Sequence, residues 1–471
     1  MQKKSLKVKQ SMKIKAKSFI AICLALNFIG CMENNYTLPK NIEKNEKLTQ
    51  YTKATQENID QWWENFNDKN LNTLIEKSLH ENLSLLAAKE QITQAYATLG
   101  ASRSSLYPSV NATAKNQRDR DITQNDEWSK NYSATVELDL AIDLWGKLRH
   151  ESRSSYYSYL MTEESYRYSA LSLAKEISKQ YMALAAHVEK TKLLQEQLRI
   201  AKNILSALNI RFNYGKTDYA NILEQERQVQ ILEATIISNK TNIISNQKAL
   251  ALLLGKSPVE GLNLNPTLPK AGTLPTTGFS SQILIKRADV RSAYFALLSA
   301  DENAAAALLE RFPNINLNFN VTSTATKSGN LFEDWLAAAL GSIVAPIFQG
   351  GAIQSKITKN RSLAQEAAYT YADTFMNALS NIEEASLREK EQRELLKNKK
   401  RQVALIESRV KRVQDQYDNG TLDYIDFIGI IQTWQTLKQE YIDYKKNYLN
   451  AQIDLYFALG SNWLSEQQEK K

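Results

Sequence analysis

Two long stretches of the chain keep the hydrophobic period of an α-helix without interruption. Neither Gly nor Pro occurs between Gly146 and Gly215, or between Gly351 and Gly420. Each interval therefore predicts about 100 Å of helix. Apolar residues within these stretches recur at spacings of three and four, which is typical of coiled-coil seams, so we expect long helices packed against each other. In the first half, the apolar residues spaced by three and four, and later by seven, are Leu198, Ala201, Leu205, Leu208, Phe212, Ile222, Val229, Ile236, Ile243 and Leu250.

One glycine interrupts each pattern in similar surroundings, "NYGKTDY" in the first half and "DNGTLDY" in the second. Glycine at a helix C-terminus adopts the left-handed conformation at little cost. We therefore expect each long helix to end there and the chain to return as an antiparallel helix. A simple turn explains the glycines but not the shared Asp-Tyr pair that follows them. The residues of interest at these tips are Gly215, Asp218, Tyr219, Gly420, Asp423, Tyr424 and Asp426.

The two halves repeat with an offset of 205 residues. Four pairs of motifs keep this offset without an insertion: Tyr107-Pro108 with Phe312-Pro313, Gly146 with Gly351, Gly215 with Gly420, and Leu254-Gly255 with Leu459-Gly460. The offset is too long for a solenoid repeat and indicates a tandem duplication. The expected segments are a signal peptide (1–30), an N-terminal extension (31–66), a first repeat (67–255), a Pro/Gly-rich linker (256–280), a second repeat (281–462) and a tail (463–471).

A period of two replaces the helical period before each long helix. "YSATVELDLAIDLW" at 132–145 and "NINLNFNVTST" at 314–324 alternate apolar and polar residues. Such alternation is typical of transmembrane β-barrel strands, and also of a half-buried soluble sheet. Glu137, Asp139 and Asp143 share the polar face, and as lumen-facing carboxylates they would favour cations. For Asp143 the alternative is a place at the start of the next helix.

Two hairpins give four strands per chain, which cannot close a barrel alone. An open sheet edge cannot face lipid, because its backbone groups would lack hydrogen-bond partners. If the strands cross a membrane, several chains must therefore share one barrel.

The net charge of +8 does not indicate nucleic-acid binding, because it is concentrated at the N-terminus. Residues 1–30 hold seven lysines and no acidic residue, which leaves +1 for the remainder. A remainder so nearly neutral offers no broad phosphate-binding surface.

The same N-terminal segment has the features of a secretion signal. The lysines precede an apolar run at 19–30, which is too short to span a bilayer. Cys31 follows Gly30 directly, so we expect it to become the lipidated N-terminus of the mature chain. Ordinary signal cleavage beside a chance cysteine is the alternative.

Motifs along nearly the whole chain after Cys31 resemble the outer membrane efflux proteins, the TolC-like family, in its lipoprotein branch serving drug and metal efflux pumps. The matching stretches are "WWENFNDKNLNTLIEKSLHENLSLLAAKEQI", "IDLWGKLR", "RFNYGKTDY" and "ALLLGKSP" in the first half, and "KRADVRSAY", "FPNINL", "APIFQGGAIQSKI", "YDNGTLDYIDF" and "YFALGSNW" in the second.

This resemblance implies a mainly α-helical fold with a membrane β-barrel portion. Three copies would form a twelve-stranded barrel in the outer membrane, continuous with a helical barrel through the periplasm. The family's gate would then lie at the helical tips, here at 215–219 and 420–426. A periplasmic adaptor and an inner membrane transporter of the resistance–nodulation–division type would dock at that end.

Other functions fit the sequence less well. His80, His150 and His187 lie far apart without ligand-spaced partners, so we expect no metal site, no catalytic site and no cofactor. A type I secretion system with an ABC transporter is the alternative setting for a duct. A periplasmic coiled-coil structural lipoprotein is the alternative of another class, but it does not need the paired strands. The sequence does not specify the exported substrate.

Overall fold

The computed structural model describes residues 61–120, 128–259, 262, 264–272 and 281–460. The expected signal segment 1–30, Cys31 and the tail 463–471 lie outside the described residues, as does most of the extension 31–66. The described chain forms two compact units. One holds residues 99–156 and 297–369, and the other holds 61–98, 157–296 and 370–460.

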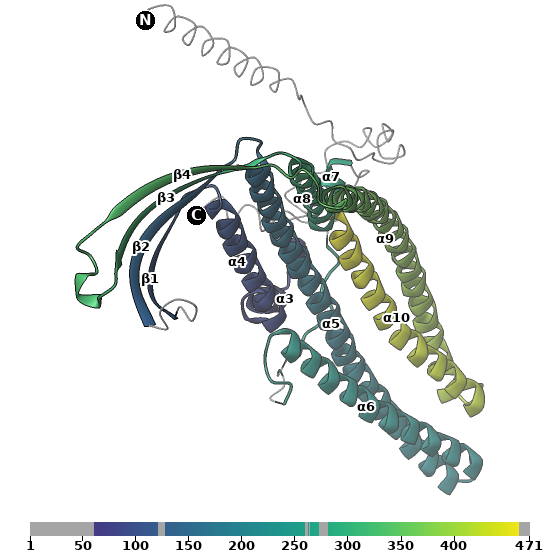
Figure 1. Ribbon diagram of the computed structural model, residues 1–471. Coiled ribbons are helices and arrows are strands. Elements are labelled where there is room, and N and C mark those ends of the chain that lie inside the picture. The colour runs from purple at the N-terminus through teal and green to yellow at the C-terminus, as the bar shows by residue number, and fades with distance from the viewer. Residues whose placement is uncertain (1–60, 121–127, 260–261, 263, 273–280, 461–471) are drawn as a thin grey trace, which may run out of the picture. The chain divides into compact units, whose positions relative to one another are not determined.

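The first unit contains a four-stranded antiparallel sheet in the order β1-β2-β3-β4 (Figure 1). Its strands are β1 (Ser109–Arg120), β2 (Trp128–Ile142), β3 (Asn314–Ala325) and β4 (Leu336–Val344), with a short 3-10 turn η5 (Ser328–Asn330) between the last two. The two hairpins come from the two sequence repeats and pair through β2 and β3. The predicted four strands per chain are thus confirmed, and β1 and β4 are the two edges.

The register of the sheet separates polar from apolar residues. Asp139 pairs with Asn318 on one face, and Leu138 pairs with Phe319 on the other. Strand β4 departs from this segregation, because Leu340 lies across from Asn318 on the polar face. Its alanine-rich sequence alternates weakly, so its faces could be assigned only from the pairing.

Four long helices form two hairpins. The bounds are α5 (Lys147–Asn213), α6 (Tyr219–Leu253), α9 (Ala352–Asp418) and α10 (Tyr424–Leu459). Helices α5 and α9 both have 67 residues, as the duplication predicts. The shorter elements are η4 (Trp62–Phe66), α3 (Lys69–Glu81), α4 (Leu83–Ser104), α7 (Ser281–Lys286) and α8 (Ala288–Leu309).

The seam between α5 and α6 follows the predicted heptads and includes a buried polar residue, Asn239. Val229 and Ile236 are buried against Leu194 and Ala201. One turn beyond Ile236, Asn239 donates to the carbonyl oxygen of His187 at 2.7 Å. A buried Asn at a seam position fixes the register of paired helices, because any slip would leave its amide without partners.

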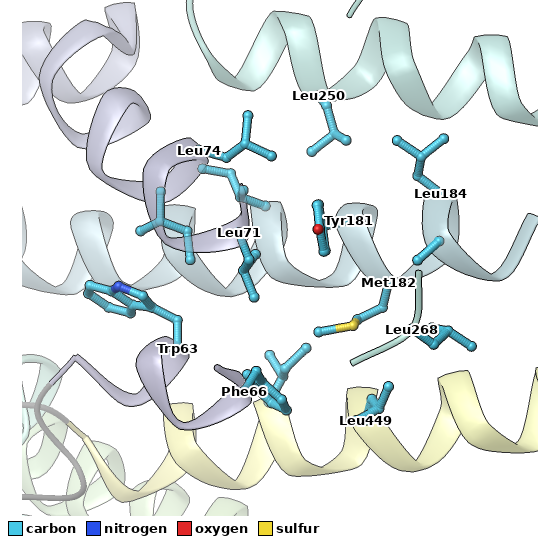
Figure 2. Packing of buried hydrophobic residues seen from close by; sticks show 14 of the residues in the cluster. Trp63, Phe66, Leu71, Leu74, Tyr181, Met182, Leu184, Leu250, Leu268 and Leu449 are labelled. Atoms are coloured by element: carbon cyan, nitrogen blue, oxygen red, sulfur yellow. The ribbon is translucent and has the colours of Figure 1, made fainter. Parts of the chain in front are cut away.

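The largest hydrophobic core lies in the second unit, where several elements converge (Figure 2). Trp63 and Phe66 from η4 and Leu71 from α3 pack against Tyr181 and Met182 of α5. The same core takes in Leu250 of α6, Leu449 of α10 and Leu268 of the predicted linker.

The linker therefore connects the two repeats and also packs, through Leu268, into the main core. The backbone N–H of Leu268 donates to Glu189 at 2.8 Å, and its carbonyl oxygen accepts from Lys445 at 2.9 Å. These contacts anchor the linker to α5 and α10.

Within the described ranges, no helix combines the length and the apolar character needed to cross a membrane.

Candidate functional site

The first hairpin tip (residues 214–218) is a glycine-terminated turn between α5 and α6. Gly215 has φ of +62°, and its N–H donates to the carbonyl of Phe212 at 2.8 Å. The N–H of Lys216 reaches the carbonyl of Arg211 at 2.9 Å. These bonds satisfy the last carbonyl groups of α5, as the left-handed glycine permits. Asp218 is the N-cap of α6, but its side chain makes no capping bond.

The second tip (residues 419–423) has the same backbone with one difference at the aspartate. Gly420 has φ of +72°, and its N–H donates to the carbonyl of Tyr417 at 3.1 Å. Here the side chain of Asp423 accepts from the N–H of Tyr424 at 2.6 Å, and Asp426 lies in the first turn of α10. Asp218 and Asp423 are both exposed, and their negative charges stabilise the N-terminal ends of α6 and α10.

The two tip tyrosines occupy equivalent positions but very different surroundings. Tyr219 is 56% exposed and packs beside Phe212, with ring centroids 5.7 Å apart. Tyr424 is 3% exposed, and its hydroxyl donates to the Oε1 atom of Gln225 on α6 at 2.7 Å. Burial raises the pKa of Tyr424, and the nearby Tyr417 and Glu224 act in the same direction. A tyrosine hydroxyl is protonated at neutral pH, and the raised pKa of Tyr424 keeps it a hydrogen-bond donor in more alkaline solution as well.

Aromatic and cationic contacts extend this junction between the two hairpins. Tyr417 stacks on Phe427 with centroids 4.6 Å apart and planes 6° from parallel. The guanidinium of Arg211, from the other hairpin, lies 4.5 Å from the centroid of the Tyr417 ring. Gln225 is fixed from its second side, because its Nε2 donates to the carbonyl of Ala201 at 2.7 Å. The tips are thus held together within one chain by a packed and hydrogen-bonded junction.

Sequence reasoning identified Tyr424 but neither its partner Gln225 nor the Arg211–Tyr417 contact beside it. A signal for Gln225 existed, because a polar residue between Ile222 and Val229 interrupts the apolar seam. No sequence signal distinguishes the buried Tyr424 from the exposed Tyr219, since both follow Asp after the tip glycine. Their difference depends on how the two hairpins face each other.

The predicted lumen carboxylates divide into two groups. Asn318 donates to both Glu137 and Asp139, at 2.7 Å in the second case, so these residues share one sheet face. Asp143 follows the end of β2 and lies at the start of α5. It accepts from the N–H of Leu148 at 3.0 Å. It also accepts from the N–H and the Nε of Arg149, both at 3.1 Å. Asp143 thus has the helix-start placement that the sequence had left as its alternative.

Two of the three histidines have structural partners. His150 binds Glu302 at 2.5 Å, and His187 binds Asn239 at 2.7 Å. In the part of the chain that the structure describes, no three His, Cys, Asp or Glu side chains are grouped as metal ligands.

Comparison with known proteins agrees with the duplicated fold. The family model described as "Outer membrane efflux protein" matches residues 74–256 and 279–461, one match for each repeat. The probable outer membrane lipoprotein SilC of Salmonella typhimurium is 23% identical over 88% of this chain and 90% of its own length. The cation efflux system protein CusC of Escherichia coli K12 is 24% identical over 85% of this chain and 88% of its own length.

Solved structures have the same fold. The chain superimposes on CusC with a TM-score of 0.80 at 22% identity, covering 88% of this chain and 96% of the other. The CmeC outer membrane channel of Campylobacter jejuni gives a TM-score of 0.80 at 22% identity, covering 94% and 97%. The family resemblance and the duplicated, mainly helical fold are therefore confirmed. The chain belongs to the outer membrane efflux protein family and is an outer membrane channel component of efflux systems.

Proposed function

We propose that three copies of this chain form one passive exit duct across the outer membrane and the periplasm. The sheet supports this, because its edges β1 and β4 have unpaired backbone groups within one chain. Such edges cannot face lipid unless they pair with further strands. Three chains with four strands each would close a twelve-stranded barrel, with Glu137 and Asp139 toward the lumen and Leu138 and Phe319 toward lipid.

The two long helical hairpins of each chain would continue the duct through the periplasm. Their tips would form its entrance, where a periplasmic adaptor and an inner membrane transporter dock. We favour a transporter of the resistance–nodulation–division type over an ABC transporter. The cargo is left open, because a cation efflux protein and a toluene efflux pump protein are both similar to this chain, at 24% and 22% identity.

The N-terminal residue of the mature protein would be Cys31, carrying a lipid anchor in the outer membrane. This follows from the signal-like residues 1–30 and from the similarity to a probable outer membrane lipoprotein. Mass spectrometry of the N-terminal peptide would detect the lipid on Cys31, and an unmodified Cys31 would refute the anchor.

The junction at the tips is the observation that carries the proposed gating. Within each chain, the Tyr424–Gln225 bond and the Arg211–Tyr417 contact hold the second hairpin against the first. In a trimer six such tips converge, and Asp218, Tyr219, Asp423, Tyr424 and Asp426 would surround the entrance. Release of the Tyr424 junction would let the second hairpin move, so that an adaptor or transporter shifts the tips between two packings.

Substitution Tyr424→Phe tests this gate while preserving the shape of the side chain. Loss of the bond to Gln225 should raise the single-channel conductance of the purified protein in planar bilayers. Tyr219→Phe is the matched control at the equivalent position of the other repeat. Within the described residues its hydroxyl makes no bond between the hairpins, so we expect a much smaller change in conductance than for Tyr424→Phe. Native mass spectrometry of the same samples should find three chains.

Two results would count against the proposal separately. Equal conductance of Tyr424→Phe and Tyr219→Phe would remove the gating role of the junction and leave Asp423 as a helix cap only. A stable monomer that conducts no ions would contradict the shared barrel itself.

A further inference from the structure

A basic cluster lies on the apolar face of the sheet, at the end that carries the hairpin turns. Arg118 and Lys130 are paired residues on β1 and β2, and Arg120 pairs with Trp128 in the next equivalent row. Paired residues of an antiparallel sheet point to the same face, and residues two apart do so as well. The pairing has no bulge, so these cations share the face of Val110 and Leu138, whose pair lies further along the same strands.

The Arg118–Lys130 pair is electrostatically unfavourable without an anion beside it. Like charges directly across a strand pair repel each other, and Arg118 and Lys130 are such a pair. Both are exposed, and Arg120 lies with its guanidinium 5.8 Å from the centroid of the Trp128 ring. The charges are therefore gathered around one surface point on the face opposite to Glu137 and Asp139.

The position of the cluster matches the edge of an apolar band. On this face the rows from Ile142 to Ala134 are almost wholly apolar, and Tyr132 follows. The strand from Ile142 to Tyr132 is about 33 Å long, which is about 25 Å along the membrane normal at the usual barrel tilt. That equals the typical height of a lipid-facing band. Lys130 lies one row beyond its end.

Aromatic residues mark the same boundary. Tyr132 pairs with Ala325 at the end of β3. In the following β3–β4 connection, Phe332 and Trp335 lie with ring centroids 5.8 Å apart. The N–H of Phe332 donates to Ser323 at 3.1 Å, which ties the connection to the apolar face. Aromatic girdles at the lipid–water boundary flank the apolar band of outer membrane barrels, so charges just beyond them lie at headgroup depth.

We propose that Arg118 and Lys130 bind a phosphate group of lipopolysaccharide, the phosphorylated glycolipid of the outer leaflet. The proposal rests on the proposed barrel, in which the hairpin turns face outward and the helices face the periplasm. Arg holds phosphate through paired N–H donors, and the Lys ammonium adds a point charge. One phosphate between Arg118 and Lys130 relieves their mutual repulsion. The symmetric trimer has three such sites on its outer wall.

The test compares three lipids on the full-length protein in neutral detergent. Labelled deep-rough lipopolysaccharide, the same glycolipid after phosphatase treatment, and phosphatidylglycerol are titrated against wild type. The Arg118→Gln/Lys130→Gln and Lys130→Gln variants are titrated in the same way. Lys115→Gln is the matched control, because Lys115 lies on β1 only a few residues away but points to the opposite face. Native mass spectrometry and conductance are recorded on each sample.

We expect wild type to prefer the phosphorylated glycolipid over both other lipids. Each cation removed should weaken that binding roughly fivefold, and Lys115→Gln should bind like wild type. A wild type that binds the dephosphorylated glycolipid equally well would overturn the site. A double variant that loses no more affinity than Lys115→Gln would also overturn it. Equal binding of phosphatidylglycerol would reduce the cluster to a general anionic contact and overturn the glycolipid assignment. Conducting trimers with any of these results would leave the duct intact, whereas monomers without conductance would refute the duct.

Discussion

At the scale of single residues, the two repeats use equivalent positions for different purposes. Asp423 caps its helix through its side chain, whereas Asp218 does not. Tyr424 joins the two hairpins, whereas Tyr219 faces solvent. The duplication therefore preserved the local backbone, while contacts between the hairpins assigned each side chain its role.

Glu389 of α9 is a buried carboxyl group in the second helical hairpin. It is 4% exposed, its Oε1 accepts no hydrogen bond within the described residues, and Arg393 is 3.9 Å away. Burial raises the pKa of Glu389, and the charge of Arg393 and a hydrogen bond from Tyr448 oppose this only in part. The carboxyl group of Glu389 therefore binds its proton more tightly in the folded protein than in the unfolded chain.

We expect the Glu389→Gln variant to lose less stability than wild type as pH rises. A raised carboxyl pKa stabilises the fold fully below the unfolded value near 4.5, and this contribution is lost as pH rises through the folded pKa. The melting temperature of the variant should thus exceed that of wild type increasingly from pH 4.5 toward pH 8. The exposed Glu391→Gln is the control and should follow wild type. Parallel profiles for wild type and Glu389→Gln would show that its burial has no cost.

At the scale of elements, Gly420 in the second tip and Gly429 inside α10 differ in whether the backbone tolerates a side chain. Gly420 has φ of +72°, where a side chain is strained. Gly429 lies inside α10, and a methyl group there would meet no heavy atom within 4 Å. The same substitution should therefore act in opposite directions at the two positions.

We predict that Gly420→Ala destabilises the protein by about 1–2 kcal/mol, because alanine disfavours the left-handed conformation. Gly429→Ala should stabilise it by up to about 1 kcal/mol, because alanine is the better helix former. Thermal denaturation followed by circular dichroism measures both. A lower melting temperature for Gly429→Ala would mean that a neighbouring chain occupies the space beside it.

At the scale of the whole molecule, the polar sheet face is expected to set ion selectivity. Glu137 and Asp139 converge on Asn318, so a trimer would carry them as rings of carboxylates in its lumen. Such rings attract cations and repel anions.

Substitution Glu137→Gln/Asp139→Asn should reduce the cation preference of the channel, measured as reversal potential across a salt gradient. Asp143→Asn is the control, because Asp143 serves the start of α5. It should lower the melting temperature and leave the reversal potential unchanged. An anion preference of the wild type would refute the lumen assignment, and a large change with Asp143→Asn would place Asp143 in the pore.

The sequence alone determined the features that depend on local periodicity. Helix lengths follow from uninterrupted apolar spacing, the hairpin tips from glycines that permit positive φ, and the sheet faces of β2 and β3 from alternation. The duplication gave the second repeat from the first. These features need only interactions between residues near one another along the chain, so a single sequence contains them.

Only the tertiary structure decided which equivalent residues differ and which distant segments meet. It placed Tyr424 against Gln225, although 199 residues separate them. It packed Leu268 of the linker into the main core, and it moved Asp143 from the strand face to a helix start. It also aligned Arg118 with Lys130 on one face. The placement of Asp143 depends on local bonds to Leu148 and Arg149, and the sequence had left it open. The other three depend on register and packing between segments, which reflect the summed free energy of many contacts that no local pattern in the sequence records.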